Sequence, residues 1–448
     1  MKRRICLLLS ACCLLLTAFC LPPSAFAAEK AVAKKQVATG QPLVLRGATV
    51  HTVSGKDLPN TSVLIKNGKI EALGQALRVA GAREIDVRGL HVYPGLINAA
   101  TTIGLTEISA VRETSDTSDL GDYNPQLRAY SVINPASEHI PVVRANGITT
   151  VLSSPSGGVI SGQAALINLA GWTIDEMAVR KSVGMVIRFP SMTQRSGRGG
   201  GIELLMMMQE GRTGGFSEAR RAYERRVAEL REWLDKARHY AQARAAETPD
   251  VKRDLKLEAL VPLVKGEQPA LMTVSTARDI RNAVEFADKE KIKVVLIDPD
   301  DAWKEAELLK KKDIPVILGP TLSLPRNEDD PYDLPYSQPA MLHKAGVKFA
   351  ISTGGVQFAR NLPYQAAQAA AFGLPKDEAL KAVTLYPAQI FGAKELGSIE
   401  AGKTANLIVT DGDPLESRTQ VKRLIIAGRE VSTDNKHKQL YEKYIARP

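Results

Sequence analysis

The sequence predicts an α/β protein, built as a (β/α)8 TIM barrel with a small β-sandwich domain formed by the N- and C-terminal segments, plus a long insertion helix. Three observations support this fold. Short runs rich in β-branched residues lie near both ends of the chain, strand-like and helix-like pieces alternate across its middle, and one long charged helix interrupts that alternation. An open doubly wound sheet has the same local pattern and remains the alternative.

The sandwich domain is predicted over residues 42–93 and 396–432, because both stretches consist of short strand-like runs separated by turns. Asn67-Gly68 lies between alternating residues, which is a strong hairpin signal. Ala427-Gly428 marks another tight turn near the other end of the chain. We therefore expect the two ends of the chain to form one composite domain.

The barrel is predicted over residues 94–395, where apolar runs alternate with amphipathic helical patterns. Runs of this kind, rich in Val and Ile, suit strands that are buried on both faces. The eight candidate strands are LHVYPGLIN, GITTVLSS, AALINL, VGMVIRF, ALMTVST, IKVVLID, IPVILG and VKFAIST.

An insertion at about 195–268 interrupts the barrel pattern and contains a long charged helix. Its apolar residues recur at spacings of three and four, which places them on one face. They are Tyr223, Val227, Leu230, Leu234, Ala237 and Ala241. The plain interpretation is a helix packed on the barrel through this stripe, and the alternative is a helix that binds a partner.

Residues 1–27 are typical of a cleaved signal peptide, with a positive start (Lys2 to Arg4), an uncharged apolar run and a small-x-small site at Ala25 to Ala27. We expect cleavage after Ala27, a periplasmic or secreted protein, and no membrane span in the mature chain. A membrane anchor fits less well because two prolines end the run. A lipoprotein signal at Cys12 fits less well because a long apolar run follows it.

All four cysteines lie in the segment to be removed, so the mature protein has no disulfide, thiolate metal site or cysteine nucleophile. Loss of Lys2, Arg3 and Arg4 lowers the formal net charge from +10 to +7. The basic residues are not clustered and aromatic residues make up only 5%, so we expect no nucleic-acid partner.

Three segments together are similar to the amidohydrolase superfamily, specifically its imidazolonepropionase-like group. They are Pro94-Gly95-Leu96-Ile97-Asn98-Ala99, GVKFAISTGG, and the closing run EALKAVTLYPAQIFGAKELGSIEAGKTANLIVTDGDPL. The resemblance implies a barrel with one or two divalent metals at its C-terminal mouth. Such metals activate a water molecule that attacks an amide, a cyclic amide or a related C–N bond.

The metal-ligand positions that the resemblance implies hold unsuitable residues, since methyl groups, neutral hydroxyls and cations are poor zinc ligands. These positions fall on Ala100 and Thr102, on Arg188 to Pro190, on Ser275 and Thr276, on the aspartates from Asp298 to Asp301, and on Gly354. Of the six histidines, only His139 is expected near the mouth, and the chain contains no His-x-His pair. The sequence therefore predicts a degenerate member without a metal site or cofactor.

Small and polar side chains are expected to line the mouth instead and to offer a pocket for a ligand. These candidates are Asn98, Thr101, Thr102, Thr150, Ser153, Ser275, Thr276, Asp298, Asp300 and Thr353. Asp298, Asp300 and Asp301 suit a hard cation such as calcium. The alternative for Asp300 and Asp301 is that they cap the helix that follows them.

The leading hypothesis is an exported, non-catalytic relative that binds a small ligand or a partner. The partner would be a second copy of this chain or an intact amidohydrolase paralogue. The alternative is an active hydrolase on non-peptide C–N bonds of the cyclic-amide type, which would need a divalent metal such as zinc at an atypical site built from the aspartates. A purely structural role is the third possibility, because function belongs to sites and not to folds.

Overall fold

The computed structural model describes residues 41–192, 216–247 and 251–447. The predicted signal peptide and the segment that precedes the insertion helix lie outside the described residues. Within the described ranges, no helix is both long enough and apolar enough to cross a bilayer.

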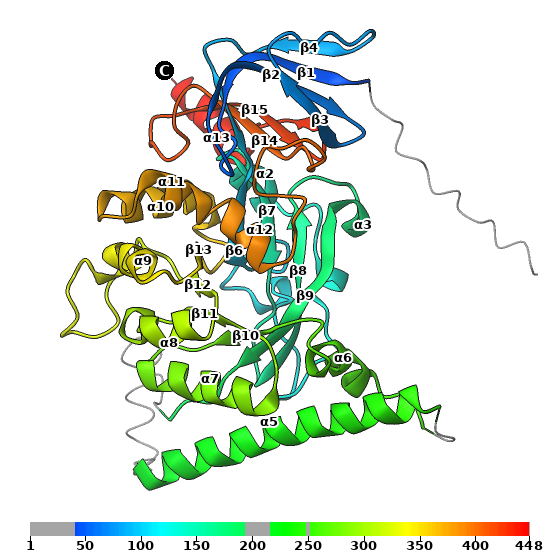
Figure 1. The fold of residues 1–448 in the computed structure, drawn as a ribbon, viewed down its shortest axis with the longest axis vertical. Coiled ribbons are helices and arrows are strands. Elements are labelled where there is room, and N and C mark those ends of the chain that lie inside the picture. Colours follow the sequence, from blue (N-terminus) through cyan, green and yellow to red (C-terminus); the bar gives the residue numbers. More distant parts are fainter. Residues whose placement is uncertain (1–40, 193–215, 248–250, 448) are drawn as a thin grey trace, which may run out of the picture. The chain divides into compact units, whose positions relative to one another are not determined.

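One eight-stranded sheet forms a nearly closed barrel, as predicted (Figure 1). Its strands neighbour one another in chain order, and each corresponds to one predicted barrel strand. They are β6 (Leu96–Thr101), β7 (Ile148–Ser153), β8 (Ile160–Asn168), β9 (Ala178–Arg188), β10 (Ala270–Thr273), β11 (Val294–Ile297), β12 (Val316–Leu318) and β13 (Phe349–Ile351).

The third strand departs from the regular β-then-α repeat, because β8 runs antiparallel to both β7 and β9. Only six residues separate the end of β7 at Ser153 from the start of β8 at Ile160. A parallel crossover needs about a dozen residues or more, so this connection can only reverse the chain. The expectation of a uniformly parallel barrel is therefore wrong at this strand.

Gly95 divides the first predicted strand into two strands of different sheets. β5 (His91–Pro94) pairs with β1 (Leu43–Val50) in the sheet formed by the chain ends, and β6 begins the barrel one residue later. The backbone at Gly95 passes so close to Thr149 that a Cβ atom there would lie 2.2 Å from the threonine Oγ1 and Cγ2 atoms. Glycine is thus required where the chain passes from one sheet to the other.

The seam of the barrel, where β13 approaches β6, is joined by side-chain hydrogen bonds. The Asn98 amide donates to Thr353 Oγ1 at 2.6 Å and its carbonyl oxygen accepts from Thr353 N at 3.2 Å. Both residues are buried, with exposed fractions of 0% and 4%. These bonds connect the first and last strands, which have no ladder pairing in the sheet order.

The two chain ends form a separate sheet, as the resemblance predicts, although it is one continuous sheet in the order β16-β15-β14-β5-β1-β2-β3. β1 pairs with β4 along its first half and with β5 at its end. Apolar side chains from both chain ends, including Leu45, Val63 and Ile425, share one core. The remaining strands are β2 (Leu58–Lys66), β3 (Lys69–Gly74), β4 (Arg83–Asp86), β14 (Leu407–Thr410), β15 (Val421–Ile426) and β16 (Arg429–Val431).

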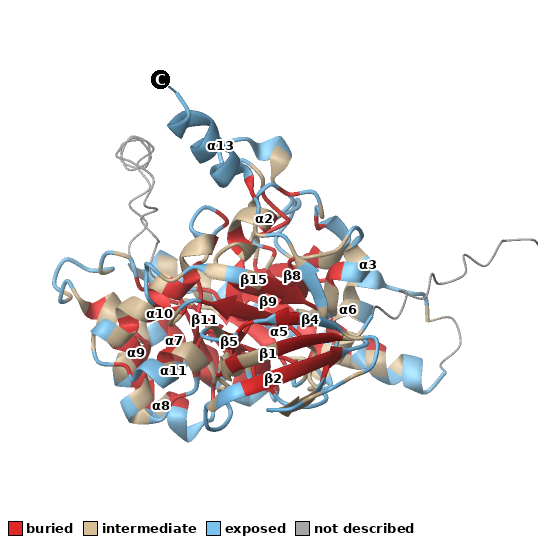
Figure 2. Ribbon diagram, turned by 90° about the horizontal axis from the view of Figure 1, so that it is seen from above, coloured by how far each residue is buried: buried red, intermediate tan, exposed pale blue. Residues whose placement is uncertain are grey.

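Helices surround the barrel strands, and the strands of both sheets are largely buried (Figure 2). The helices are α2 (His139–Arg144), α3 (Ile174–Met177), α5 (Phe216–Ala245), α6 (Leu255–Val264), α7 (Ala277–Glu290), α8 (Ala306–Lys311), α9 (Leu334–Ala345), α10 (Leu362–Ala371), α11 (Lys376–Lys381), α12 (Leu385–Ile390) and α13 (Lys436–Ile445). Short 3-10 turns are η2 (Arg112–Thr114), η3 (Ala129–Val132), η4 (Ala302–Glu305) and η5 (Ala359–Asn361).

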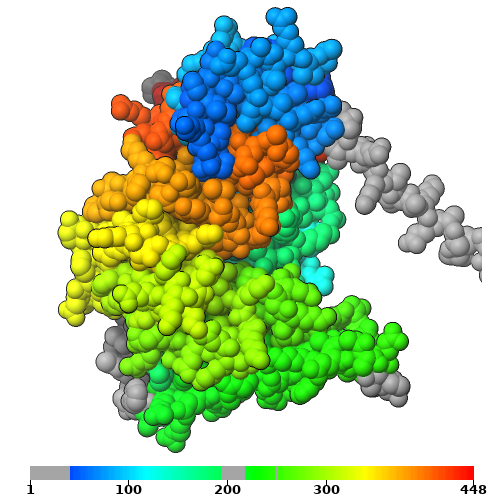
Figure 3. Space-filling model, in the orientation of Figure 1, coloured from blue at the N-terminus to red at the C-terminus, as the bar shows by residue number. Residues whose placement is uncertain are grey.

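The insertion helix α5 lies along the barrel (Figure 3). It packs there through its apolar stripe, as the plain interpretation expects. Leu230, Leu234 and Ala237 are fully buried in the same cluster as side chains of α6 and α7. Glu290 at the end of α7 fixes the helix further, because it accepts bonds from Arg231 Nε at 2.8 Å and Arg238 at 3.0 Å. The middle of the stripe is therefore covered by the barrel, while Tyr223, Val227 and Ala241 are half-buried.

Candidate functional site

Two predicted pocket residues hold the strand ends at the barrel mouth together. Thr101 Oγ1 donates to the backbone oxygen of Leu152 at 3.1 Å, and Ser153 Oγ donates to that of Ile103 at 2.7 Å. Both side chains are buried, with exposed fractions of 2% and 0%. Both hydroxyls thus donate hydrogen bonds to acceptors within the protein, as the Asn98 amide does at the seam.

The other hydroxyl residues near the mouth lie on two loops. Thr276 caps α7, because its side chain accepts from Asp279 N at 3.2 Å. Ser275 is buried, and its backbone oxygen accepts from Asp301 N at 3.0 Å. Thr102 follows β6 and is half-buried. Thr276 and Ser275 thus make structural contacts on these loops.

Thr150 lies at the opposite end of the barrel from the mouth, so its prediction as a mouth residue is wrong. Its hydroxyl donates to Asn168 Oδ1 at 3.1 Å and accepts from Asn406 Nδ2 at 3.1 Å. Asn406 also accepts from Ala427 N at 2.7 Å. This buried network joins the barrel to the terminal sheet, and Thr150 enters it because it sits near the start of β7.

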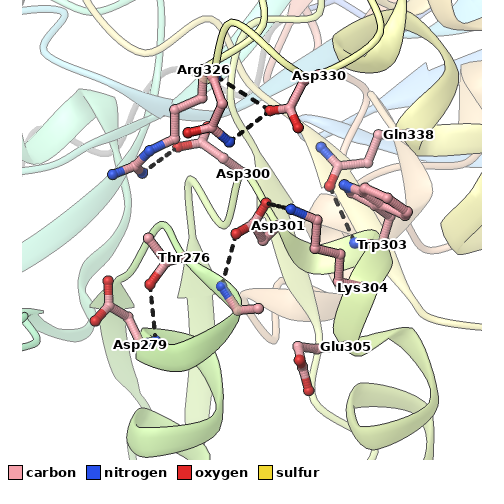
Figure 4. A network of polar contacts seen from close by, with 12 residues as sticks. Thr276, Asp279, Asp300, Asp301, Trp303, Lys304, Glu305, Arg326, Asp330 and Gln338 are labelled. Atoms are coloured by element: carbon pink, nitrogen blue, oxygen red, sulfur yellow. Dashed lines mark hydrogen bonds and ion pairs between the residues drawn. The ribbon is translucent and has the colours of Figure 1, made fainter. Parts of the chain in front are cut away.

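The aspartates after β11 are engaged with nearby residues (Figure 4). Asp300 pairs with Arg326 at 2.9 Å. Asp301 accepts from Ala277 N at 3.0 Å and pairs with Lys304 at 2.8 Å. Asp301 therefore caps α7 across the loop and makes no cap bond to η4, which follows it. The prediction that Asp301 caps the helix after it is wrong, because its carboxylate bonds to the start of α7 in the neighbouring unit.

The residues at the mouth do not fit a catalytic metal. Across the described ranges, no group of three or more His, Cys, Asp or Glu side chains is placed to hold a metal ion. β6 carries Ala100 near its end, the exposed Arg188 ends β9, and Gly354 follows β13. His139 bonds through Nε2 to the backbone oxygen of Glu107 at 2.8 Å. No hydrolytic step through a metal can be assigned to these residues.

A polar cluster that the sequence reasoning missed lies at the other end of the barrel, beside the terminal sheet. His51 follows β1, and its Nδ1 lies 2.8 Å from Asp57 Oδ2. Its Nε2 lies 3.0 Å from His91 Nδ1, and its ring stacks on Tyr93 with centroids 4.1 Å apart. The available signal was the pair His91 and Tyr93, which alternate on β5 and so share one face of a strand.

Burial lowers the pKa of His51 from its ordinary value of 6.5, although the neighbouring Asp57 opposes that effect. Just below pH 6.5, the His51 imidazole is therefore less protonated in the folded protein than in the unfolded chain. The stabilising contribution is complete above pH 6.5 and is lost as the pH falls from 6.5 through the lower folded pKa.

The free energy of unfolding of the wild type should fall as the pH drops below 6.5. In His51→Gln it should fall less, because the substitution removes this titration. Urea unfolding over a pH series measures the effect. His437→Gln, on the exposed helix α13, is the matched control and should leave the pH dependence unchanged. Equal pH slopes for the wild type and His51→Gln would contradict the prediction.

Comparison with known proteins supports the amidohydrolase resemblance. Residues 293–431 match the amidohydrolase family. Amidohydrolase tasK from Hapsidospora irregularis is 25% identical over 421 residues, which are 84% of this chain. The chain spans only 42% of the length of that relative.

Solved structures share the fold. An amidohydrolase from Thermotoga maritima MSB8 matches with a TM-score of 0.75 and 26% identity, over 87% of this chain and 99% of that one. Molinate hydrolase matches with a TM-score of 0.54 and 18% identity, over 88% of this chain and 95% of that one, and it shows likeness of fold alone.

The chain thus shares the fold of solved amidohydrolase structures, and its residues 293–431 match the amidohydrolase family. The finer assignment to the imidazolonepropionase-like group stays a prediction.

Proposed function

We propose that this chain is an exported binding protein on an amidohydrolase scaffold, without the metal-dependent hydrolysis that the resemblance implies. The observation that carries the proposal is the set of side chains at the mouth. Apart from the aspartates after β11, the expected ligand positions hold Ala100, Thr102, Arg188, Thr276 and Gly354, and none of these offers an imidazole or carboxylate to zinc. Arg188 would in addition repel a divalent cation, because its guanidinium keeps its charge at any ordinary pH.

The aspartates near the mouth support the same proposal. Asp301 uses one oxygen to cap α7 and the other to pair with Lys304, and Asp300 pairs with Arg326. A metal bound to these carboxylates would have to displace an arginine and a lysine and leave the start of α7 without its cap. Loss of a helix cap alone costs about 1 kcal/mol.

Metal analysis of the purified mature chain tests the proposal. After exposure to zinc, manganese or calcium and desalting, we expect metal content far below one equivalent per chain. We also expect no hydrolysis of the cyclic amides hydantoin and dihydrouracil. The reason is that hydroxyls and a guanidinium cannot replace the histidine and carboxylate ligands.

Asp300→Asn is the matched variant for this test, because it removes a carboxylate near the mouth and keeps the size of the side chain. It should leave the metal content unchanged. The opposite result would be one equivalent of metal in the wild type, its loss in Asp300→Asn, and metal-dependent hydrolysis. That result would establish the active hydrolase on C–N bonds instead.

Partner binding remains part of this proposal, either with a second copy or with an intact amidohydrolase paralogue. Because Leu230, Leu234 and Ala237 of the α5 stripe are buried against the barrel, such a partner would contact other residues of the protein. The molecular mass of the chain in solution, measured alone and in a mixture with a paralogue from the same host, tests the proposal. A single monomeric species under both conditions would contradict it.

A further inference from the structure

A cavity of about 770 Å³ lies between the terminal sheet and helices α11 and α12. His51 and Asp57 after β1, Tyr93 of β5, Lys381 of α11, Tyr386 of α12 and Asp413 after β14 contribute to its walls. These segments come from both ends of the chain and from the last helices of the barrel. The volume is in the range of small-molecule sites in proteins.

This cavity is separate from the barrel mouth. Ala388 and Phe391, at the end of α12, pack in the same cluster as the inward-facing side chains Ile97, Leu152 and Leu166 of the barrel. They therefore fill the interior of the barrel at the N-terminal ends of its strands. A ligand in the cavity would not reach the mouth, so binding in this cavity is independent of the function proposed for the mouth.

The lysines of the cavity are neutralised by carboxylates of their own. Lys381 bonds to Asp377 at 3.0 Å and to Glu378 at 2.8 Å. Two further lysines are paired in the same way: Lys403 with Glu400 at 3.3 Å, and Lys376 with Glu416 at 3.3 Å. The cavity therefore has little positive charge left for an anionic ligand.

Two other carboxylates of the cavity have no lysine or arginine partner within the described residues. Asp413 accepts from the backbone nitrogen of Leu415 at 2.9 Å, and within the described part of the chain no cation pairs with it. Asp57 bonds to His51, whose lowered pKa favours the neutral imidazole near pH 7. The charge of Asp57 is thus not cancelled by an imidazolium. The cavity consequently presents net negative charge.

Tyr93 adds a buried polar group to this wall. It is 5% exposed, and its hydroxyl makes no hydrogen bond to another residue of the described ranges. Burial, with Asp413 and Asp57 nearby, raises the pKa of this phenol, so the hydroxyl stays protonated. The hydroxyl is accessible from the cavity, where it can donate a hydrogen bond to a ligand or water.

The cavity also has an apolar lining, which Leu380, Leu385 and Leu415 provide. A ligand that contacts both kinds of lining therefore carries a positive group and a hydrocarbon group.

We propose that this cavity binds a protonated primary amine with an apolar group, its ammonium held by Asp413 and Asp57 beside the Tyr93 hydroxyl and its apolar part against the three leucines. The ammonium would also lie near the stacked rings of His51 and Tyr93, where an aromatic face attracts a cation.

Calorimetric titration of the mature chain with phenethylamine at pH 7 tests this proposal, with phenethyl alcohol as the uncharged probe of similar shape. We expect saturable binding of the amine with a Kd below about 1 mM, and binding of the alcohol at least about tenfold weaker. No saturable binding of the amine, or equal binding of the two probes, would overturn it.

Asp413→Asn should weaken amine binding by about tenfold or more, because it removes the charge and keeps an acceptor for Leu415 N. The matched control is Asp411→Asn, two residues away, where the carboxylate pairs with Lys422 at 2.9 Å outside the cavity. It should leave the affinity unchanged. Equal affinity of Asp413→Asn and the wild type, with both variants folded, would show that the amine binds elsewhere and would overturn the assignment.

Discussion

Gly95→Ala is expected to lower the free energy of unfolding by about 3 kcal/mol or more. The new Cβ would lie 2.2 Å from Thr149 Oγ1 and Cγ2 and 2.7 Å from Thr149 Cβ. Thr149 is fully buried, and Gly95 N is itself bonded to Asn406 O at 2.8 Å, so neither side can move away freely. The midpoint of urea unfolding measures the effect.

Gly355→Ala is the matched control, because no atom lies within 4 Å of the position that its Cβ would take. It should change the free energy of unfolding by less than about 0.5 kcal/mol. The double variant Gly95→Ala with Thr149→Gly should be less destabilised than the two single changes together, since it removes the clashing atoms. Equal stability of Gly95→Ala and Gly355→Ala would show that the close approach is not a constraint.

Asn98→Ala is expected to cost about 3 kcal/mol, because it opens the seam between the first and last barrel strands. The substitution leaves the buried Thr353 N–H without an acceptor and its hydroxyl without a donor, and it creates a small cavity where Asn98 is fully buried. We expect a lower urea midpoint and faster amide hydrogen exchange in β13, whose backbone lies at this seam.

Asn327→Ala, on an exposed loop, is the control for Asn98→Ala, since its amide bonds to the nearby Asp330 at 2.8 Å. Its expected cost is below about 0.5 kcal/mol. If Asn98→Ala and Asn327→Ala were equally stable, the seam would have to be held by apolar packing alone.

Most of the fold follows from local sequence pattern. All eight barrel strands, the terminal strands and the insertion helix form near their predicted positions, because runs of β-branched residues and periodic apolar positions act over a few residues. The orientation of β8 did not follow from its own sequence. It depends on the short connection after Ser153, whereas the repeat of a regular (β/α)8 barrel has a helix between successive strands.

The candidate site was harder to predict. A run of Thr, Ser and Asp at strand ends suggests a polar pocket, but a hydroxyl can bond to the backbone as easily as it can face a ligand. Thr101 and Ser153 do the former, and Thr150 lies at the wrong end of the barrel. The cavity that holds His51 and Asp413 joins residues that are far apart in the chain. No local pattern predicts such a pairing.

The sequence by itself determined the fold class and the residue types at the mouth, because strand and helix patterns are local and a methyl or hydroxyl cannot become an imidazole. Only the tertiary structure decided which polar groups are hydrogen-bonded within the protein and which carboxylates pair with a lysine or arginine. The reason is that hydrogen bonds such as Asn98 to Thr353 and the pairing of each lysine depend on how distant segments meet. The contacts between distant segments are set by strand register and packing, which a single segment of sequence does not specify.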